Sequence, residues 1–246
     1  MKFPDPLTLK SLAVGDTIIF AGSQLTGVKH LQEDYYNSFN DECFVIADGV
    51  SEMSHSEVAA KLAGETAIWG YKHVRQRPFY WADKRLLLKR IFRSCNLTLW
   101  QKRKEYGFEA GLGAALGVVI ASTNKVWAGS VGDGSIFIYR ESLIDEMTPP
   151  DIDKKGKLTD MLGIKRLGLI PHLAVESFLP GDIIVMATSG VSCFVSEDEL
   201  RVSLEMSGGT KESLNTAVVH LLRTAEENGS TGNMTVCVIK RKRADE

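Results

Sequence analysis

Residues 114–140 read AALGVVIASTNKVWAGSVGDGSIFIYR, and this stretch sets the architecture of the chain. It holds three runs rich in β-branched and apolar residues, 114–121, 126–131 and 136–140, separated by two short turns. Runs of this kind bounded by turn residues are typical of strands. Because neither connection is long enough to contain a crossover helix, we expect the three strands to run antiparallel. The second connection contains Asp133-Gly134, which is a favoured sequence for a two-residue hairpin turn.

Further strands are expected where the chain is again apolar and β-branched. These segments are 17–21, 43–47, 183–187 and 234–240. Between the third strand of the central stretch and the strand at 183–187, residues 142–172 contain several prolines and glycines. We interpret this segment as an irregular and mobile excursion.

Helices are indicated by capping sequences and by apolar residues at helical spacing. Ser54-His55-Ser56-Glu57 and Ser196-Glu197-Asp198-Glu199 both match the capping box, with Ser at the N-cap and Glu three residues later. A longer helix is expected over about 82–105. Its apolar positions, and those of a second helix near the C-terminus, are Leu88, Ile91, Phe92, Cys95 and Leu99, and Leu214, Ala217, Val218, Leu221, Leu222 and Ala225.

Each of these helices has one apolar stripe, which it must bury against a sheet. Two antiparallel sheets packed together, with helices outside each, would bury every stripe. We therefore predict an α+β fold in four layers, α-β-β-α. The 246 residues fit a single domain, 1–246, without a disulfide or a metal to stabilise it.

The composition indicates which partners to exclude and which cellular compartment to expect. Hydrophobic residues make up 44% of the chain, charged residues 24%, and the net charge is -2, so we expect no nucleic-acid partner. No apolar run reaches the roughly 20 residues that span a bilayer, and Met1 to Pro6 lack a signal-peptide core, so we expect no membrane association. Four well-separated cysteines, Cys43, Cys95, Cys193 and Cys237, form no CxxC motif and fit a reducing, cytoplasmic setting.

A series of short motifs carries the chemistry. They are Gln32-Glu33-Asp34, Ala47-Asp48-Gly49, Val131-Gly132-Asp133-Gly134, Thr188-Ser189-Gly190 and Gly232-Asn233-Met234-Thr235. The first three place carboxylates at strand ends and turns, where oxygen ligands commonly hold hard cations. The last two occupy the same kind of position, but with Ser189 and Gly232 in place of an acidic residue.

In order and spacing these motifs resemble the metal-dependent protein phosphatases of type 2C, the PPM family, over nearly the whole chain. The matching segments are Gly27-Val28-Lys29 to Glu33-Asp34, Phe44 to Gly49, Gly113-Ala114-Ala115-Leu116, Val131 to Ser135, Leu179-Pro180-Gly181-Asp182 to Gly190, and Gly232 to Val236. The resemblance implies the α-β-β-α sandwich. It also implies hydrolysis of phosphoserine or phosphothreonine, in which a water bridging two Mg²⁺ or Mn²⁺ ions attacks phosphorus.

The resemblance also implies roles for individual residues. Asp48 would bridge the two metals, with the Gly49 carbonyl as a neighbouring ligand. Glu33 and Asp34 would complete the second metal site, and Asp133 would bind an accessory third ion. From the residues alone, Asp48 and Asp133 could equally be turn residues, and Glu33-Asp34 an exposed acidic pair.

Lys29 stands where the family has an arginine that grips phosphate, and its ammonium offers a point charge rather than a bidentate fork. We interpret His55 as an early-helix residue rather than a general acid. No basic partner near Cys193 in sequence supports a thiol nucleophile.

The pattern departs from the family at the first metal site. Of its three carboxylate positions, matched by Asp48, Ser189 and Gly232, only Asp48 keeps the acid, whereas the second site looks intact. We therefore expect one Mn²⁺ or Mg²⁺ site and a degenerate second one, in a pseudophosphatase that binds a phosphoprotein or a serine/threonine kinase. The alternative is an active phosphatase that recruits a substitute ligand, with candidates Asp151, Asp153 and Asp198.

Overall fold

A computed structural model describes residues 18–28, 31–53, 55–108 and 111–243. Within them, two antiparallel sheets pack face to face. Sheet A has the order β1 (Ile18–Leu25), β10 (Met234–Arg241), β9 (Ile183–Ala187), β6 (Ser135–Arg140), β7 (Leu143–Thr148). Sheet B has the order β2 (Asp34–Phe39), β3 (Cys43–Gly49), β4 (Ala114–Ala121), β5 (Lys125–Val131), β8 (His172–Ser177).

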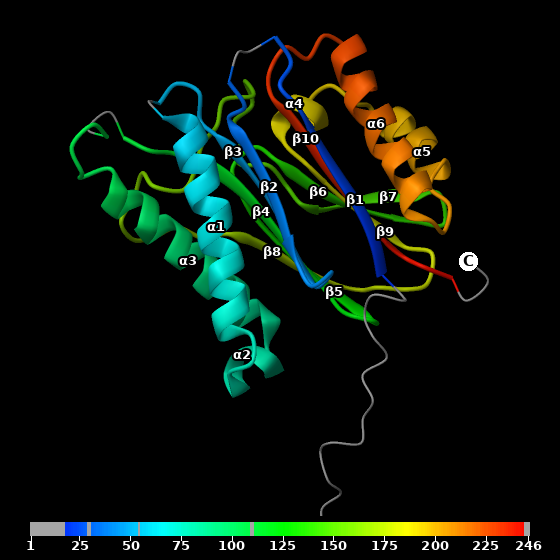
Figure 1. Ribbon diagram of the computed structural model, residues 1–246, viewed down its shortest axis with the longest axis horizontal. Helices are drawn as coiled ribbons and strands as arrows, with labels where there is room; N and C mark the ends of the chain where they lie inside the picture. The colour runs from blue at the N-terminus through cyan, green and yellow to red at the C-terminus, as the bar shows by residue number, and fades with distance from the viewer. Residues whose placement is uncertain (1–17, 29–30, 54, 109–110, 244–246) are drawn as a thin grey trace, which may run out of the picture.

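Helices cover the outer face of each sheet (Figure 1). α1 (Ser56–Val74), α2 (Pro78–Ala82) and α3 (Lys84–Lys102) lie on the side of sheet B, where α1 packs on β2, β3 and β4. α4 (Ser189–Ser192), α5 (Glu197–Glu205) and α6 (Lys211–Glu227) lie on the side of sheet A, where α6 packs on β1 and β10. The predicted α+β sandwich of four layers is confirmed.

Three apolar clusters hold these layers together. The first joins α1 and α3 to sheet B, the second lies between the sheets, and the third joins sheet A to α5 and α6. Phe44, in the middle cluster, is fully buried and meets Phe20 edge to face, with ring centroids 5.0 Å apart. The apolar positions predicted for α3 and α6 are all buried.

Most of the predicted strands are present. β4 and β9 span the predicted residues, while β3, β5, β6 and β10 differ by one or two residues at an end. β1 begins at Ile18 among the described residues, so the predicted Thr17 lies outside them. Cys43, Cys95 and Cys237 are buried and Cys193 is exposed, all as free thiols.

One predicted connection is wrong. Residues 132–134 do not form a hairpin within one sheet, because β5 belongs to sheet B and β6 belongs to sheet A. The turn crosses from one sheet to the other at φ 103° for Gly132, where a Cβ would lie 2.3 Å from the Cβ of Ala115. Only glycine fits so close an approach in that backbone region, and the crossing places Asp133 between the ends of the two sheets.

The segment 142–172 is more ordered in structure than predicted, because its first part forms strand β7. The rest is irregular but tied to its surroundings by hydrogen bonds. The Asn96 amide donates to the carbonyl of Lys165 (2.8 Å) and accepts from the N–H of Gly163 (2.9 Å). Strands β2 and β8, which carry polar and charged residues, were not predicted.

The two predicted capping boxes have different outcomes. At α5 the box is present, with Ser196 and Glu199 bonded reciprocally. At α1 the predicted cap is wrong: the N-cap residue is His55, at φ 60°, and it forms no side-chain cap hydrogen bond. Ser54 lies outside the described residues. Ser56, the first residue of the helix, donates its hydroxyl to Glu33, so a tertiary contact holds the start of α1.

Candidate active site

The candidate residues gather where several strands end on the same side of the sandwich. Asp34 begins β2 and Asp48 lies directly opposite it near the end of β3. The turn carrying Asp133 follows β5, Thr188-Ser189 follows β9, and Gly232-Asn233 precedes β10. Segments that are far apart in sequence therefore meet at one end of the two sheets, as the motifs predict.

Asp34 is held by hydroxyl groups from the other sheet. Its Oδ2 accepts the hydroxyl of Thr188 at 3.0 Å and that of Thr235 at 2.6 Å. The Thr235 N–H donates to the Thr188 hydroxyl, and Gln24 donates to the Thr235 hydroxyl. Because Asp34 starts a strand of sheet B and both threonines belong to sheet A or its margin, this network links the two sheets at the site.

Glu33 is also held by hydroxyl groups. Ser51 donates to its Oε2 at 2.9 Å and Ser56 to its Oε1 at 2.6 Å. The Glu33 carbonyl accepts the N–H of Gly49, and the Glu33 N–H donates to the side chain of Asn233 at 3.1 Å. These bonds fix the β2 start against the turn that follows β3.

Ser189 lies between two carboxylates. Its hydroxyl donates to Oδ2 of Asp48 at 3.3 Å, and it lies near enough to Asp133 to lower the pKa of that carboxyl. Burial raises the pKa of Asp48 well above its usual range, and the neighbouring charges of Asp34 and Asp133 raise it further. Burial also raises the pKa of Asp133, although its backbone bond and Ser189 oppose the shift. A hydroxyl thus lies among three acidic groups that repel one another.

The site glycines have different surroundings. A Cβ on Gly49 would lie 2.1 Å from the carbonyl oxygen of Ser56, so the close packing of β3 on the start of α1 requires glycine. A Cβ on Gly232 would meet nothing within 4 Å, so a side chain fits there. Gly27 has φ 66° and its Cβ would lie 2.3 Å from the Gly232 carbonyl, which leaves glycine as the residue that fits.

Lys29 lies outside the described residues, so its contact with phosphate stays a prediction. The flanking chain is attached to the site, because Asn233 donates its amide to the carbonyls of Thr26 and Leu31 at 3.1 and 3.0 Å. Asn233 therefore holds Thr26 and Leu31 beside the start of β2.

The proposed substitute ligands have other partners. Asp151 accepts the N–H of Gly132 at 2.9 Å and contacts Nε2 of His172 at 2.8 Å. Asp153 accepts the N–H groups of Lys155 and Lys157, which lower its pKa. Asp198 pairs with Arg201 one turn along α5. Sequence reasoning offered Asp151 as a ligand, whereas in the structure it anchors the crossing turn to β8.

His55 and Cys193 make no contact that suggests catalysis. The His55 ring packs against Phe108, with centroids 4.9 Å apart, at the start of α1. Burial raises the pKa of the Cys193 thiol, and the charge of Asp133 raises it further. The neutral thiol is a weak nucleophile.

The donor set does not fit a pair of metal ions. Within 18–28, 31–53, 55–108 and 111–243, no three His, Cys, Asp or Glu residues are grouped so that they could hold a metal. Glu33, Asp34 and Asp48 all accept hydrogen bonds from serine or threonine hydroxyls.

None of the described helices combines the length and the apolar character needed to cross a membrane. A comparison with curated protein sequences gives no significant match.

Solved structures show the same fold. The serine/threonine phosphatase PstP/Ppp of Mycobacterium tuberculosis superposes with a TM-score of 0.78 at 17% identity, over 92% of this chain and 100% of that one. Stp1 from Staphylococcus aureus gives 0.80 at 16% identity, over 91% and 95%. The PstP catalytic domain in complex with two manganese ions gives 0.76 at 19% identity, over 92% and 99%.

Sequence comparison identifies the family itself. The family profile described as Protein phosphatase 2C matches residues 13–231, which is most of the chain. Together with the four-layer sandwich and the carboxylates at one end of it, this match shows that the chain belongs to the protein phosphatase 2C (PPM) family.

Proposed function

We propose that this member of the family is a pseudophosphatase, which binds a phosphoprotein or a serine/threonine kinase and has weak or no hydrolytic activity. The observation that carries the proposal is the Ser189 hydroxyl, which donates to Asp48 and lies near Asp133. A neutral donor at this point competes with a cation for the carboxylate lone pairs and adds no negative charge.

The charge balance supports the same conclusion. Hydrolysis in this family depends on divalent cations, which would lower the pKa of a bound water and neutralise charge on the phosphoryl oxygens. Ser189 and Gly232 leave this end of the sheets two negative charges short of the family pattern. Each tenfold loss of cation affinity corresponds to about 1.4 kcal/mol, so losing two charges beside the cation weakens its binding by orders of magnitude.

The residues that remain can still recognise a partner. Asn233, Glu33 and the two threonines on Asp34 keep this end of the sheets rigid. Asp34, Asp48 and Asp133 repel a phosphate dianion, so binding of a phosphorylated segment would rely on Lys29. We propose that the partner and this chain meet in the cytoplasm.

The alternative is an active phosphatase, and one observation favours it: acidic groups still converge at the site, with open space at Gly232 for a water or another ligand. Hydrolysis of a phosphopeptide and of p-nitrophenyl phosphate in Mn²⁺ separates the two proposals. We expect wild type and Asp48→Asn to be equally inactive, and the double variant Ser189→Asp with Gly232→Asp to gain activity.

Turnover by the wild type that disappears in Asp48→Asn would refute the pseudophosphatase proposal. A binding measurement completes the test, because a pseudophosphatase retains its partner. Calorimetry with phosphorylated and unphosphorylated forms of one peptide should show preferential binding of the phosphorylated form by the wild type, without release of phosphate.

A further inference from the structure

A second candidate binding site lies on the other side of sheet A. A cavity of about 350 Å³ lies between part of the outer face of this sheet and residues of α4, α5 and α6. Its apolar lining comes from both layers: Phe137, Ile144, Val185, Val191, Leu200 and Leu221. The volume falls within the range of about 300–1,000 Å³ that is usual for ligand pockets.

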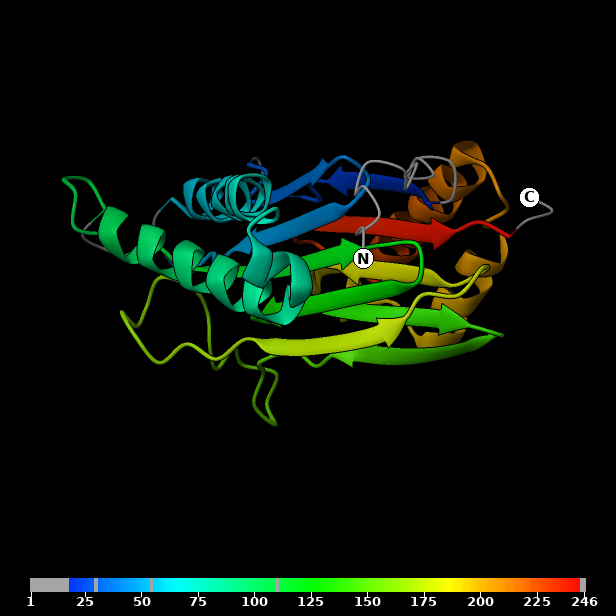
Figure 2. The same ribbon diagram turned by 90° about the horizontal axis from the view of Figure 1, so that it is seen from below.

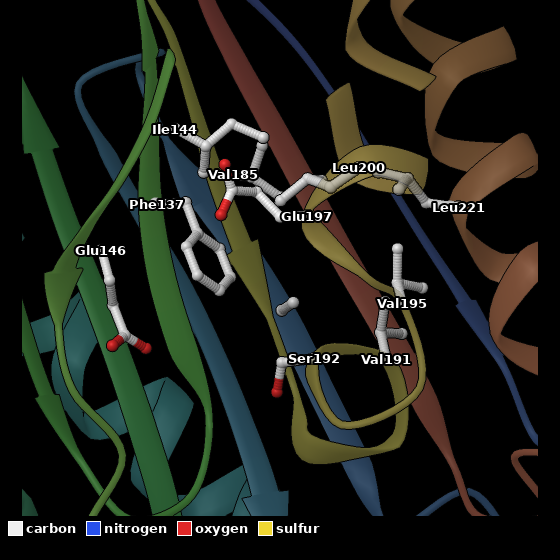
Figure 3. Close-up of a pocket in the computed structure, with 11 residues that line it drawn as sticks. Phe137, Ile144, Glu146, Val185, Val191, Ser192, Val195, Glu197, Leu200 and Leu221 are labelled. Atoms are coloured by element: carbon white, nitrogen blue, oxygen red, sulfur yellow. The ribbon is translucent and has the colours of Figure 1, made fainter. Parts of the chain in front are cut away.

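Two carboxylates lie at this cavity, which is shown in Figure 3. Glu197 extends from the start of α5 toward Ile144 and Phe137, and Glu146 of β7 lies on the other side of Phe137. Both glutamates are exposed, and the side chain of neither forms an ion pair or a hydrogen bond with any residue in the described part of the chain. The apolar cavity is therefore bordered by uncompensated negative charge.

The cavity is continuous with an open sheet edge. β7 is the last strand of sheet A, and Figure 2 shows no described strand or helix that continues the sheet beyond it. Across the described ranges, residues 143–147 make their backbone–backbone hydrogen bonds with β6 alone. The outer N–H and C=O groups of β7 thus remain available for pairing with another strand.

The alternation of side chains along β7 places residues of the open sheet edge in the cavity lining. Ile144 and Glu146 are two residues apart, so they lie on the same face of the strand, and both line the cavity. A strand added at this edge would place one side chain beside Ile144 and the next but one beside Glu146. An apolar side chain suits the first position and a lysine or arginine suits the second.

We propose that β7 and the cavity together bind an extended segment of a partner protein, with an apolar side chain in the cavity and a basic side chain two residues away against Glu146 and Glu197. The main chain of the segment would pair with β7, while the cavity and the carboxylates would select its sequence. This proposal does not depend on whether the candidate active site hydrolyses phosphate.

A second copy of this chain fits the edge less well. Asp145 and Glu146 are both exposed on β7, so antiparallel pairing of two β7 strands about these residues would set like charges opposite one another. Like charges directly opposed across strands are destabilising. The same charges attract a basic strand, which is why the occupant is assigned to a partner of that composition.

The test uses a fluorescein-labelled octapeptide in which Leu and Lys alternate with Thr, followed by fluorescence anisotropy. We expect saturable binding to the wild type and at least tenfold weaker binding to the variant Glu146→Lys with Glu197→Lys. The matched control Glu65→Lys with Glu212→Lys makes the same charge change at exposed positions outside the cavity lining and should bind like the wild type.

Two control peptides test the mode of binding. Replacing Lys by Glu should abolish binding, and N-methylation of the outward amides should weaken it at least tenfold if the peptide pairs with β7. Hydrogen exchange should slow at residues 143–147 when the peptide binds. Circular dichroism confirms that each variant is folded.

Several results would overturn the proposal. They are failure of the Leu/Lys peptide to bind the wild type, equal affinity for the N-methylated peptide, equal affinity of the two charge-reversal variants, and protection that excludes β7. A concentration-dependent dimer with protected β7 amides in the absence of peptide would assign the edge to a second copy instead.

Discussion

Asp34 and Asp48 occupy directly paired positions on β2 and β3, and each accepts a hydroxyl from the segment that follows β9. The donors are the adjacent residues Thr188 and Ser189, so one short stretch of sheet A contacts both acids. The arrangement explains how two carboxylates remain close together at this end of the molecule: part of their charge is offset by oriented hydroxyl groups.

The first prediction concerns cation affinity. Ser189→Asp with Gly232→Asp should tighten Mn²⁺ binding at least tenfold, because two negative charges are added at this end of the sheets and the Cβ of residue 232 has open space. Isothermal titration calorimetry measures the change. Ser189→Asn with Gly232→Asn supplies side chains of the same size without charge, and an equal gain in that control would contradict the electrostatic explanation.

The second prediction concerns the Thr235 hydroxyl, which is buried and donates to Asp34 at 2.6 Å. Thr235→Val should lower the free energy of unfolding by about 1–3 kcal/mol, because a buried carboxylate loses a donor while the shape is nearly kept. Urea denaturation measures this. Thr235→Ser keeps the hydroxyl and should lose less; a larger loss for Ser would show that the methyl group matters more.

The third prediction compares two glycines of the site. Gly49→Ala should destabilise the protein by about 1–3 kcal/mol, since its Cβ would lie 2.1 Å from the Ser56 carbonyl oxygen and the backbone must shift. Gly232→Ala should leave the melting temperature nearly unchanged or raise it slightly, because nothing lies within 4 Å. Thermal unfolding of both variants checks the pair, and equal destabilisation would be inconsistent with this packing.

The fourth prediction concerns acid stability. Hydrogen bonds from Asn228 and from Ser196 lower the pKa of Glu199 to about 2, below its ordinary value near 4.5. The ionised carboxylate therefore stabilises the fold above pH 4.5, and this contribution is lost as the pH falls toward 2. The difference in melting temperature between the wild type and Glu199→Ala should shrink over that interval. A difference that stays constant with pH would argue against a charged capping contact.

Local patterns in the sequence predict much of this fold. The apolar stripes of α3 and α6 and the runs of β4 and β9 each determine one element and the face that it buries. β2 and β8 were not predicted, because neither sequence has the apolar, β-branched run that indicates a strand. β2 reads DYYNSF and β8 reads HLAVES. Their place in sheet B depends on pairing with β3 and β5, which is a tertiary effect.

The candidate site was likewise predicted only in part. Motif order predicts which acidic residues come together, but it does not predict which hydroxyls hold them. The bonds from Ser56 to Glu33 and from Thr235 to Asp34 join residues 23 and 201 positions apart, so no local sequence rule could reveal them. The crossing at Gly132 was mistaken for a hairpin because Asp-Gly suits both turns, and only the sheet assignment distinguishes them.

Helix α4 is only four residues long, yet it borders two surfaces at once. Its first residue, Ser189, touches Asp48, while Val191 and Ser192 line the cavity behind sheet A. A single helical turn cannot flex independently at its two ends, so an occupant that displaces Val191 would also alter the distance from Ser189 to Asp48. Binding of a ligand in the cavity would then change the pKa of Asp48 at the candidate active site.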